Sequence, residues 1–258
     1  MTMKLTRRAF NGCIAASGLG GLACVCSAQA TKPQPIFGCI LPVNRAGYYL
    51  DRSTRPRLYI TGQEPIVSKS GDKDFDFALA QTLARISEVF NVLPGFAYYE
   101  DVEAQNAYAT AVVKLKNADG TVLFGQNLLR TVLAGKESPD VAVAAVCAHE
   151  FGHILQFKYG LDKVVSEGQK TVKRVELQAD YLAGYFAGVR KRERPSFPAA
   201  VFAMTQFNNG DQQVTHQGHH GTPDERAQAV GQGFEASFSL NLTISAALQA
   251  STRYVMSF

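Results

Sequence analysis

Two histidines stand four residues apart in the stretch VCAHEFGHILQ, and a glutamate follows the first of them directly. On a helix, residues i and i+4 lie on one face, so His149 and His153 can point at a single metal ion. Glu150 is rotated away from that face, which makes it a poor third ligand but lets it reach a water molecule beside the metal. The spacing therefore predicts a metal-binding helix with a base next to the metal.

The alternative is an ordinary buried helix whose histidines only satisfy polar partners in the core. Residues 141–146, just before the first histidine, are almost wholly apolar, so we expect this helix to be buried. Buried polar groups that lack partners cost free energy. Two histidines and a glutamate on such a helix therefore need partners, and a metal ion supplies one.

A catalytic zinc site has three protein ligands and one open position, so a third ligand must come from elsewhere in the chain. The metzincin pattern is excluded, because Gln156 and Tyr159 stand where that class has Gly and His. The stretch RVELQADYLAGYF offers Glu176 and Asp180 on one face of a second helix. We expect Glu176 to bind the metal and Asp180 to hold a ligand histidine by its free ring N–H. The alternative, two solvated acids, is disfavoured by their apolar neighbours.

Periodicity and turn signals predict the elements that carry these residues. Predicted strands precede most of the predicted helices, and this order indicates an α+β fold. Residues 31–70 are rich in Pro, Gly and short polar breaks, so we expect loops and short strands there. We predict strands over 106–115 and 121–124 around an Asp-Gly turn, and helices over 73–90, from a Ser138-Pro139 cap to about Gly160, over roughly 170–190, and through most of the tail from about Thr222.

The first thirty residues indicate an export signal: a basic start, a short Gly-rich apolar middle and the small-x-small sequence Ala28-Gln29-Ala30. Arg7-Arg8 within TRRAF resembles the twin-arginine motif. The alternative is a general secretory signal with a chance arginine pair. Replacing both arginines with lysine and fractionating cells distinguishes the two routes. We expect a periplasmic or otherwise exported protein without stable membrane insertion after signal removal, since no later apolar run is long enough to span a bilayer.

Composition narrows the remaining classes. The chain is 46% apolar and 19% charged, which is typical of a globular protein. The formal net charge is +4, but three of the positive residues lie in the signal, so a nearly neutral body gives no reason to expect nucleic-acid binding. Cys39 and Cys147 follow the signal and can pair in an oxidising envelope. The alternative that we favour makes Cys147 a buried thiol in a helix.

With these residues in view, AHEFGH and ELQAD resemble the gluzincin zinc proteases. The likeness is greatest to the peptidases grouped with the CAAX prenyl proteases and the bacterial heat-shock membrane proteases, and to related neutral zinc metallopeptidases of bacterial envelopes. It covers roughly residues 75–230. Three further segments are similar to family motifs: Asn106, Ala107, Tyr108 and Ala109 to the Asn-Ala-x-Ala of the edge strand, Gly125 with Leu128 and Leu129 to Gly-x-x-Leu-Leu, and His220 with Arg226 to His-Pro-x-x-x-x-Arg, with Gly221 where Pro is usual.

The resemblance implies a soluble, exported zinc endopeptidase with one Zn²⁺ per chain and a zincin-like fold, in which an edge strand lies over the HExxH helix and a second helix bears the glutamate ligand. Glu150 would be the general base toward a zinc-activated water. The strand at 106–109 would hold a protein or peptide substrate by strand addition. His220 would donate to the oxyanion. His216 and His219 are expected in an exposed polar loop.

This interpretation makes residues 71–258 the metallopeptidase domain, preceded by the signal and an N-terminal extension at 31–70. The runner-up is a metal-binding pseudo-protease that acts as an envelope chaperone or assembly factor. It is disfavoured because Glu150, which only the chemistry requires, is intact. Nothing in the sequence sets the oligomeric state.

Overall fold

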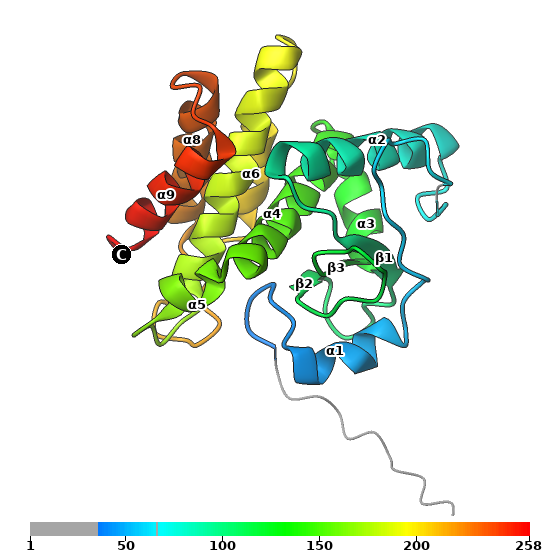
Figure 1. Cartoon of the computed structure of the whole chain (residues 1–258), viewed down its shortest axis with the longest axis horizontal. Coiled ribbons are helices and arrows are strands. Elements are labelled where there is room, and N and C mark those ends of the chain that lie inside the picture. The colour runs from blue at the N-terminus through cyan, green and yellow to red at the C-terminus, as the bar shows by residue number, and fades with distance from the viewer. Residues whose placement is uncertain (1–35, 66) are drawn as a thin grey trace, which may run out of the picture. The chain divides into compact units, whose positions relative to one another are not determined.

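The computed structural model describes residues 36–65 and 67–258, which fall within one compact unit. The fold mixes helices with a small three-stranded sheet and is mostly helical (Figure 1). The α+β prediction is therefore confirmed at the level of fold class. The predicted signal and its cleavage site lie outside the described residues.

The sheet has the strand order β1-β3-β2 and is mixed. The central strand β3 (Thr121–Gly125) pairs in parallel with β1 (Gly95–Tyr99) and antiparallel with β2 (Ala107–Thr110). Both predicted strands exist, but the first is shorter than expected. It stops at Thr110 because the chain then loops back, with the Thr121 hydroxyl donating to the carbonyl of Val112 at 2.7 Å.

The outer edge of β2 is not bare. Ile40 forms a parallel bridge with Ala109, the Leu41 N–H donates to the Ala109 carbonyl at 2.8 Å, and the Ala109 N–H donates to the Cys39 carbonyl at 2.9 Å. A short segment from the N-terminal part of the described chain therefore runs beside the last strand of the sheet.

Helix α1 (Val43–Leu50) follows that segment, so the expectation of only loops and short strands at 31–70 is wrong for these residues. Ala46 and Leu50 are spaced four apart and are both buried. With Leu41 they pack against the sheet residues Ala97, Tyr99, Tyr108 and Leu123. Packing of this one apolar face makes a short helix stable here, since isolated eight-residue helices are marginal.

Helix α4 (Pro139–Tyr159) is the centre of the fold. It contacts β2 and β3 on one side and α6 and α7 on the other (Figure 1). The predicted helices at 73–90, 139–160, 170–190 and in the tail are confirmed within a few residues. Besides α1 and α4, the helices of the described chain are α2 (Lys73–Phe90), α3 (Gln126–Leu133), α5 (Leu161–Ser166), α6 (Lys173–Glu193), α7 (Ala200–Asn208), α8 (Pro223–Phe238) and α9 (Ile244–Val255).

The residues that precede α8 and α4 differ in whether their side chains cap the helix. Thr222 caps α8 in a capping box with Glu225, as its sequence indicates. Ser138 precedes α4, but it adopts a left-handed backbone (φ 41°) and its side chain makes no capping hydrogen bond, so the expected serine cap is wrong. Pro139 at the first turn still sets the start of α4, because its φ suits a helix and it lacks the N–H that would need a partner.

Helices α6 and α8 lie in backbone contact. A Cβ added to Gly184 would lie 2.0 Å from the Val230 carbonyl oxygen, and one added to Gly233 would lie 1.7 Å from the Tyr181 carbonyl oxygen. Contacts this short exclude any side chain at either position. The two helices are therefore held at a fixed separation by their glycines.

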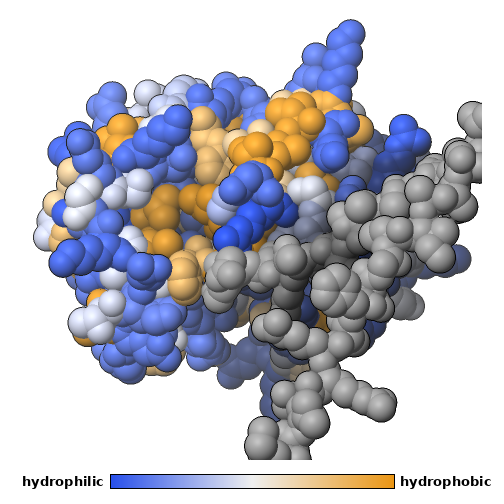
Figure 2. All heavy atoms as spheres, turned by 90° about the horizontal axis from the view of Figure 1, so that it is seen from below, coloured by the Kyte–Doolittle hydropathy of each residue, from blue (hydrophilic) through white to orange (hydrophobic). Residues whose placement is uncertain are grey.

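The face drawn in Figure 2 is mostly hydrophilic, with apolar side chains gathered near its middle. Within the described part of the chain, every helix is too short or too polar to cross a bilayer.

Candidate metal centre

The predicted chemistry-bearing residues of α4 are deeply buried. His149 is 2% exposed, Glu150 1% and His153 0%. The expectation that this helix is buried is confirmed, and its cause is the apolar sequence on all sides, which lets α4 contact the sheet and the other helices at once. Burial at this depth means that each polar atom needs a partner.

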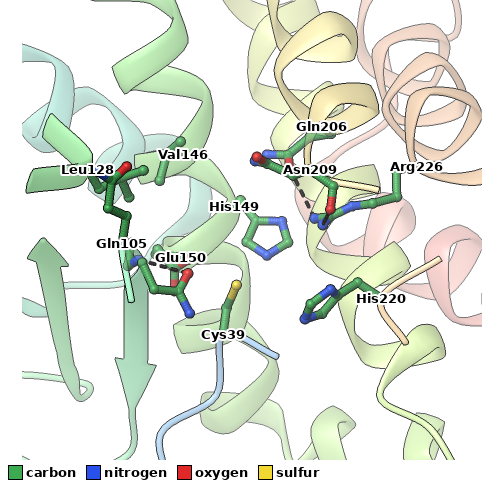
Figure 3. A pocket seen from close by; sticks show the side chains of 12 residues that line it. Cys39, Gln105, Leu128, Val146, His149, Glu150, Gln206, Asn209, His220 and Arg226 are labelled. Atoms are coloured by element: carbon green, nitrogen blue, oxygen red, sulfur yellow. Dashed lines mark hydrogen bonds between the residues drawn. The ribbon is translucent and has the colours of Figure 1, made fainter. Parts of the chain in front are cut away.

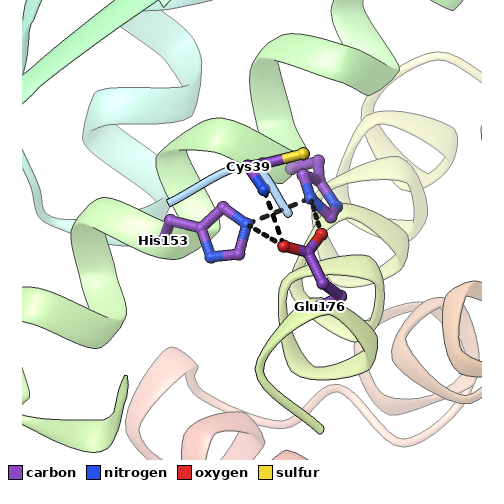
Figure 4. Close-up of side chains that lie close together, drawn as sticks. Cys39, His153 and Glu176 are labelled. Atoms are coloured by element: carbon purple, nitrogen blue, oxygen red, sulfur yellow. Dashed lines mark hydrogen bonds and ion pairs between the residues drawn. The ribbon is translucent and has the colours of Figure 1, made fainter. Parts of the chain in front are cut away.

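Four potential ligand atoms converge at this point. The two histidine Nε2 atoms lie 3.1 Å apart, and Glu176 on α6 places Oε2 3.1 Å from His149 Nε2 and Oε1 3.7 Å from His153 Nε2. Cys39 joins them, so that one ligand atom from each of the four residues lies within 4.8 Å of all the others (Figure 4). The structure thus brings together the three sequence-predicted ligands and adds a thiol. Such a buried group can bind a metal ion.

The ring orientations test this fit. Nδ1 of His149 lies 2.7 Å from Asp180 Oδ1, and Nδ1 of His153 lies 2.7 Å from Gln156 Oε1. Asp180 accepts as a carboxylate. Gln156 accepts through Oε1, because its amide N–H₂ is committed to the carbonyl of Val175 and to Gln178 Oε1. A neutral ring at either position would therefore carry its proton on Nδ1 and turn its Nε2 lone pair toward the cluster. Converging lone pairs of this kind suit a cation.

The electrostatics agree with the geometry. Burial by itself lowers the pKa of His149, but the carboxylates of Asp180 and Glu176 outweigh burial and raise it to about 10. Burial likewise acts to raise the pKa of Glu176, but His153 and His149 outweigh it and hold that pKa well below its usual range. Without a metal, His149 therefore retains a second ring proton and a positive charge. A metal ion would replace that proton.

Asp180 has a second partner behind the histidine. Arg226 on α8 donates from Nε to Asp180 Oδ2 at 2.7 Å and from a terminal nitrogen to Oδ1 at 2.9 Å. Burial raises the pKa of Asp180, but the Arg226 guanidinium outweighs it and lowers that pKa. Asp180 therefore stays ionised while it orients the ring of His149. Gln206 on α7 accepts a further hydrogen bond from Arg226 at 3.0 Å.

Gln156 is a partner that the sequence interpretation missed. In the sequence, Gln156 stands out only as a departure from the metzincin pattern, although its position three residues after His153 places both on one helix face. Gln178, at the midpoint between Glu176 and Asp180, completes the contact by accepting from Gln156 and donating to Ser251 and Thr252 of α9. The i, i+3 spacing in HILQ was the available signal.

Replacing Gln156 with Leu should weaken metal affinity by about 10–100-fold, because the ring of His153 loses the acceptor that fixes its tautomer. Competition with a chromophoric chelator measures the change. Gln249→Leu, at an exposed position of α9, is the control and should leave affinity unchanged. Equal affinity of wild type and Gln156→Leu would show that the hydrogen bond does not orient the ligand.

Glu150 lies beside the cluster at a cavity of about 170 Å³ (Figure 3). Its Oε2 atom is buried and has no hydrogen-bond partner among the residues that the structure describes. Burial raises the pKa of Glu150 to about 7. The cavity is lined by residues that include Cys39, Asn106, Leu128, His149, Glu150 and His220.

The loop before α8 places its histidines differently from expectation. His220 lines the cavity, and its backbone N–H donates to Asp211 Oδ2 at 3.0 Å. Burial lowers its pKa. His216 is exposed as expected. His219, expected in an exposed loop, is only 2% exposed and its Nδ1 lies 2.7 Å from Asp211 Oδ1, so that expectation is wrong. Asp211 anchors the loop, because its carboxylate bonds to the His219 ring and accepts from the His220 N–H.

The predicted substrate strand divides into two parts. Asn106 and Ala107 line the cavity, with the Ala107 N–H donating to Asn106 Oδ1. Tyr108 packs away from it with Leu41 and Leu123, and Ala109 pairs with the Cys39–Leu41 segment. The Asn106–Ala107 end of β2 therefore lies at the cavity, and the Ala109 end is covered by the Cys39–Leu41 segment.

The two cysteines in the described part of the chain are both free. Cys147 is fully buried within α4, as the favoured alternative has it, and burial raises the pKa of its thiol. Cys39 faces the cavity and the cluster instead. Burial, then the carboxylates of Glu176 and Glu150, raise the pKa of that thiol too.

Comparison with protein-family models, with curated proteins and with solved structures gives no match. The resemblance to gluzincin peptidases therefore stays a prediction from the sequence motifs.

Proposed function

We propose that the protein is a zinc-dependent endopeptidase. The observation that carries the proposal is the position of Glu150: a buried carboxylate oxygen without a partner among the described residues, at a cavity next to two converging histidine lone pairs. A structural metal site needs no such group. A hydrolytic site needs a base at this place.

Zinc is the metal that the donors suit best, since imidazole, carboxylate and thiolate together are typical zinc ligands. His149, His153 and Glu176 would hold it. A bound Zn²⁺ supplies Lewis acidity, which lowers the pKa of water and polarises a carbonyl.

The chain's own residues supply the other parts of the reaction. Glu150 accepts a proton from water and passes it to the leaving amine. Asp180, itself held by Arg226, keeps the proton of His149 on Nδ1. The Asn106–Ala107 end of β2 gives the substrate backbone a strand to pair with. In this interpretation the arrangement is zincin-like, with an edge strand beside the HExxH helix and a second helix bearing the glutamate.

A second function has one observation in its favour. Cys39 brings the number of donor residues to four, and four protein ligands are typical of structural zinc sites that leave no open position. A metal-binding envelope chaperone or assembly factor would use such a closed site. The unpartnered Glu150 favours the peptidase.

Metal removal separates these candidates. The purified full chain should contain about one zinc per molecule and cleave members of a mixed peptide library, and a chelator should abolish cleavage until zinc is restored. A Cys39→Ala variant is assayed in parallel, since four donors close the site and three leave it open. A zinc-loaded protein that cleaves nothing in either form would contradict the peptidase and favour the second function.

His220 should act on the transition state without holding the metal. Its place at the cavity, with its backbone tied to Asp211, leaves the ring as a donor for the developing oxyanion. His220→Ala should lower kcat by about 10²–10³-fold with zinc content unchanged. Steady-state kinetics at equal zinc occupancy provide the measurement, with His216→Ala as the exposed control. Loss of zinc from His220→Ala would make this histidine a ligand instead.

We also propose that the protein is exported by the twin-arginine route. The support is the sequence of the first thirty residues, which include the Arg7-Arg8 pair. That route carries folded proteins, so the metal would bind before export. Normal export of the Arg7→Lys, Arg8→Lys variant in fractionated cells would point to the general secretory route.

A further inference from the structure

The segment that contains Cys39 approaches the candidate centre in two ways. Its thiol belongs to the cluster of donors, with His149, His153 and Glu176 (Figure 4). The same side chain also lines the cavity, where it lies between Glu150 and His220 with its sulfur toward His149 (Figure 3). Cys39 thus stands where a substrate group and an attacking water would have to meet the metal.

The backbone on either side of Cys39 occupies the edge of β2. Ala109 uses both its N–H and its carbonyl in hydrogen bonds to this segment, at 2.9 Å to the Cys39 carbonyl and 2.8 Å from the Leu41 N–H. These are the groups through which an edge strand binds an extended peptide. The bridge is parallel, so the segment runs along β2 in the direction opposite to that of an antiparallel peptide.

The segment is fitted closely to the cluster. The Cys39 N–H donates to Glu176 Oε1 at 2.8 Å. Gly38 before it has a φ of +75°, and a Cβ there would lie 2.4 Å from the same oxygen, so only glycine permits this approach. Leu41 on the other side is 1% exposed and packs beneath the sheet. Both flanks therefore hold Cys39 in place over the ligands.

We propose that Cys39 is a fourth ligand of the metal and that residues 38–41 act as a built-in inhibitor of the chain's own active site. This inference rests on the proposed peptidase function. A thiolate in the fourth position converts an open site into a closed one, and the paired segment keeps substrate off the Ala109 end of β2. The protein then folds in a latent form. Activation requires that the Cys39 sulfur leave the metal and that the two hydrogen bonds to Ala109 break.

The test uses the full chain loaded with Co²⁺ in place of zinc, in wild type, Cys39→Ala and Cys147→Ala. A thiolate ligand gives Co²⁺ an intense near-ultraviolet charge-transfer band that imidazole and carboxylate ligands do not give. Wild type and Cys147→Ala should show the band, and Cys39→Ala should lose it. Cys147 is the matched control, because it is a buried thiol two residues before His149 but outside the cluster. Cys39→Ser, which preserves the shape of the side chain, repeats the test if Cys39→Ala folds poorly.

The same three proteins, loaded with zinc to equal occupancy, are assayed for peptide cleavage. If about 99% of wild-type molecules are in the thiolate-bound form, removal of the thiol should raise cleavage by about 100-fold. An unchanged band in Cys39→Ala, or no band in wild type, would overturn the proposal. A lost band without a rise in cleavage would show that Cys39 is a ligand but that the protein is not latent. Complete inactivity of every variant would refute the peptidase function, while the band would still report on the ligand.

Discussion

The Glu150→Gln variant should retain its metal and lose peptide cleavage by about 10²–10⁴-fold, the contribution typical of a positioned general base. The amide keeps the size of the side chain but cannot accept the proton from water. Because the contacts that join His149, His153 and Glu176 do not involve Glu150, this cluster should form as before.

The measurement is cleavage of a good library peptide at equal zinc content, in the wild-type and Cys39→Ala backgrounds, so that latency cannot hide the effect. Glu167→Gln, at an exposed position after α5, serves as the control for the change of charge. Equal cleavage by Glu150→Gln and its parent would refute the assignment of the base. A loss of zinc in Glu150→Gln would mean that this glutamate is a ligand.

The largest effect on stability should come from Arg226→Met. Arg226 is 3% exposed and Asp180 is fully buried, so the change leaves a buried carboxylate without its guanidinium partner. Breaking a buried pair from one side costs about 3–5 kcal/mol. Arg226 also donates to Gln206 and to the carbonyl of Asn209, so α7 loses its polar contacts to α8 at the same time.

Denaturant unfolding of the metal-free protein measures this loss without a contribution from metal binding. Arg253→Met, on the exposed side of α9, should change the free energy of unfolding by less than about 0.5 kcal/mol. Adding Asp180→Asn to Arg226→Met should recover part of the stability, because the unpaired charge is then removed. A double variant as unstable as the sum of both single variants would mean that the pair is not coupled.

The sequence was sufficient for those parts of the site whose partners are close along the chain. The i, i+4 spacing of His149 and His153 fixes their common face once α4 is a helix, and the apolar run before them makes that helix buried. The same holds for Glu176 and Asp180 on α6. The start of α8 behaves likewise, since Thr222 and Glu225 of its capping box are three residues apart.

What the sequence did not reveal depends on contacts across long separations. Cys39 and Glu176 are 137 residues apart, and no periodicity links a thiol in a Pro- and Gly-rich stretch to a carboxylate on a distant helix. The burial of His219 likewise requires Asp211 and the folded loop around both. Helix α1 was missed because its eight residues carry little intrinsic preference and gain their stability from the sheet.

The backbone contact between α6 and α8 has a consequence for how this protein can change over generations. Gly184 and Gly233 leave no room for another side chain, and the two helices that they join carry Glu176, Asp180 and Arg226. Selection therefore has little freedom at these two positions, because a replacement would shift the helices that carry the candidate ligands. The opposite wall of the cavity is built from Gln105, Asn106 and Leu128, which lie outside these helices. Under the proposed peptidase function, single substitutions there would change the substrate preference and leave the residues of the chemistry in place.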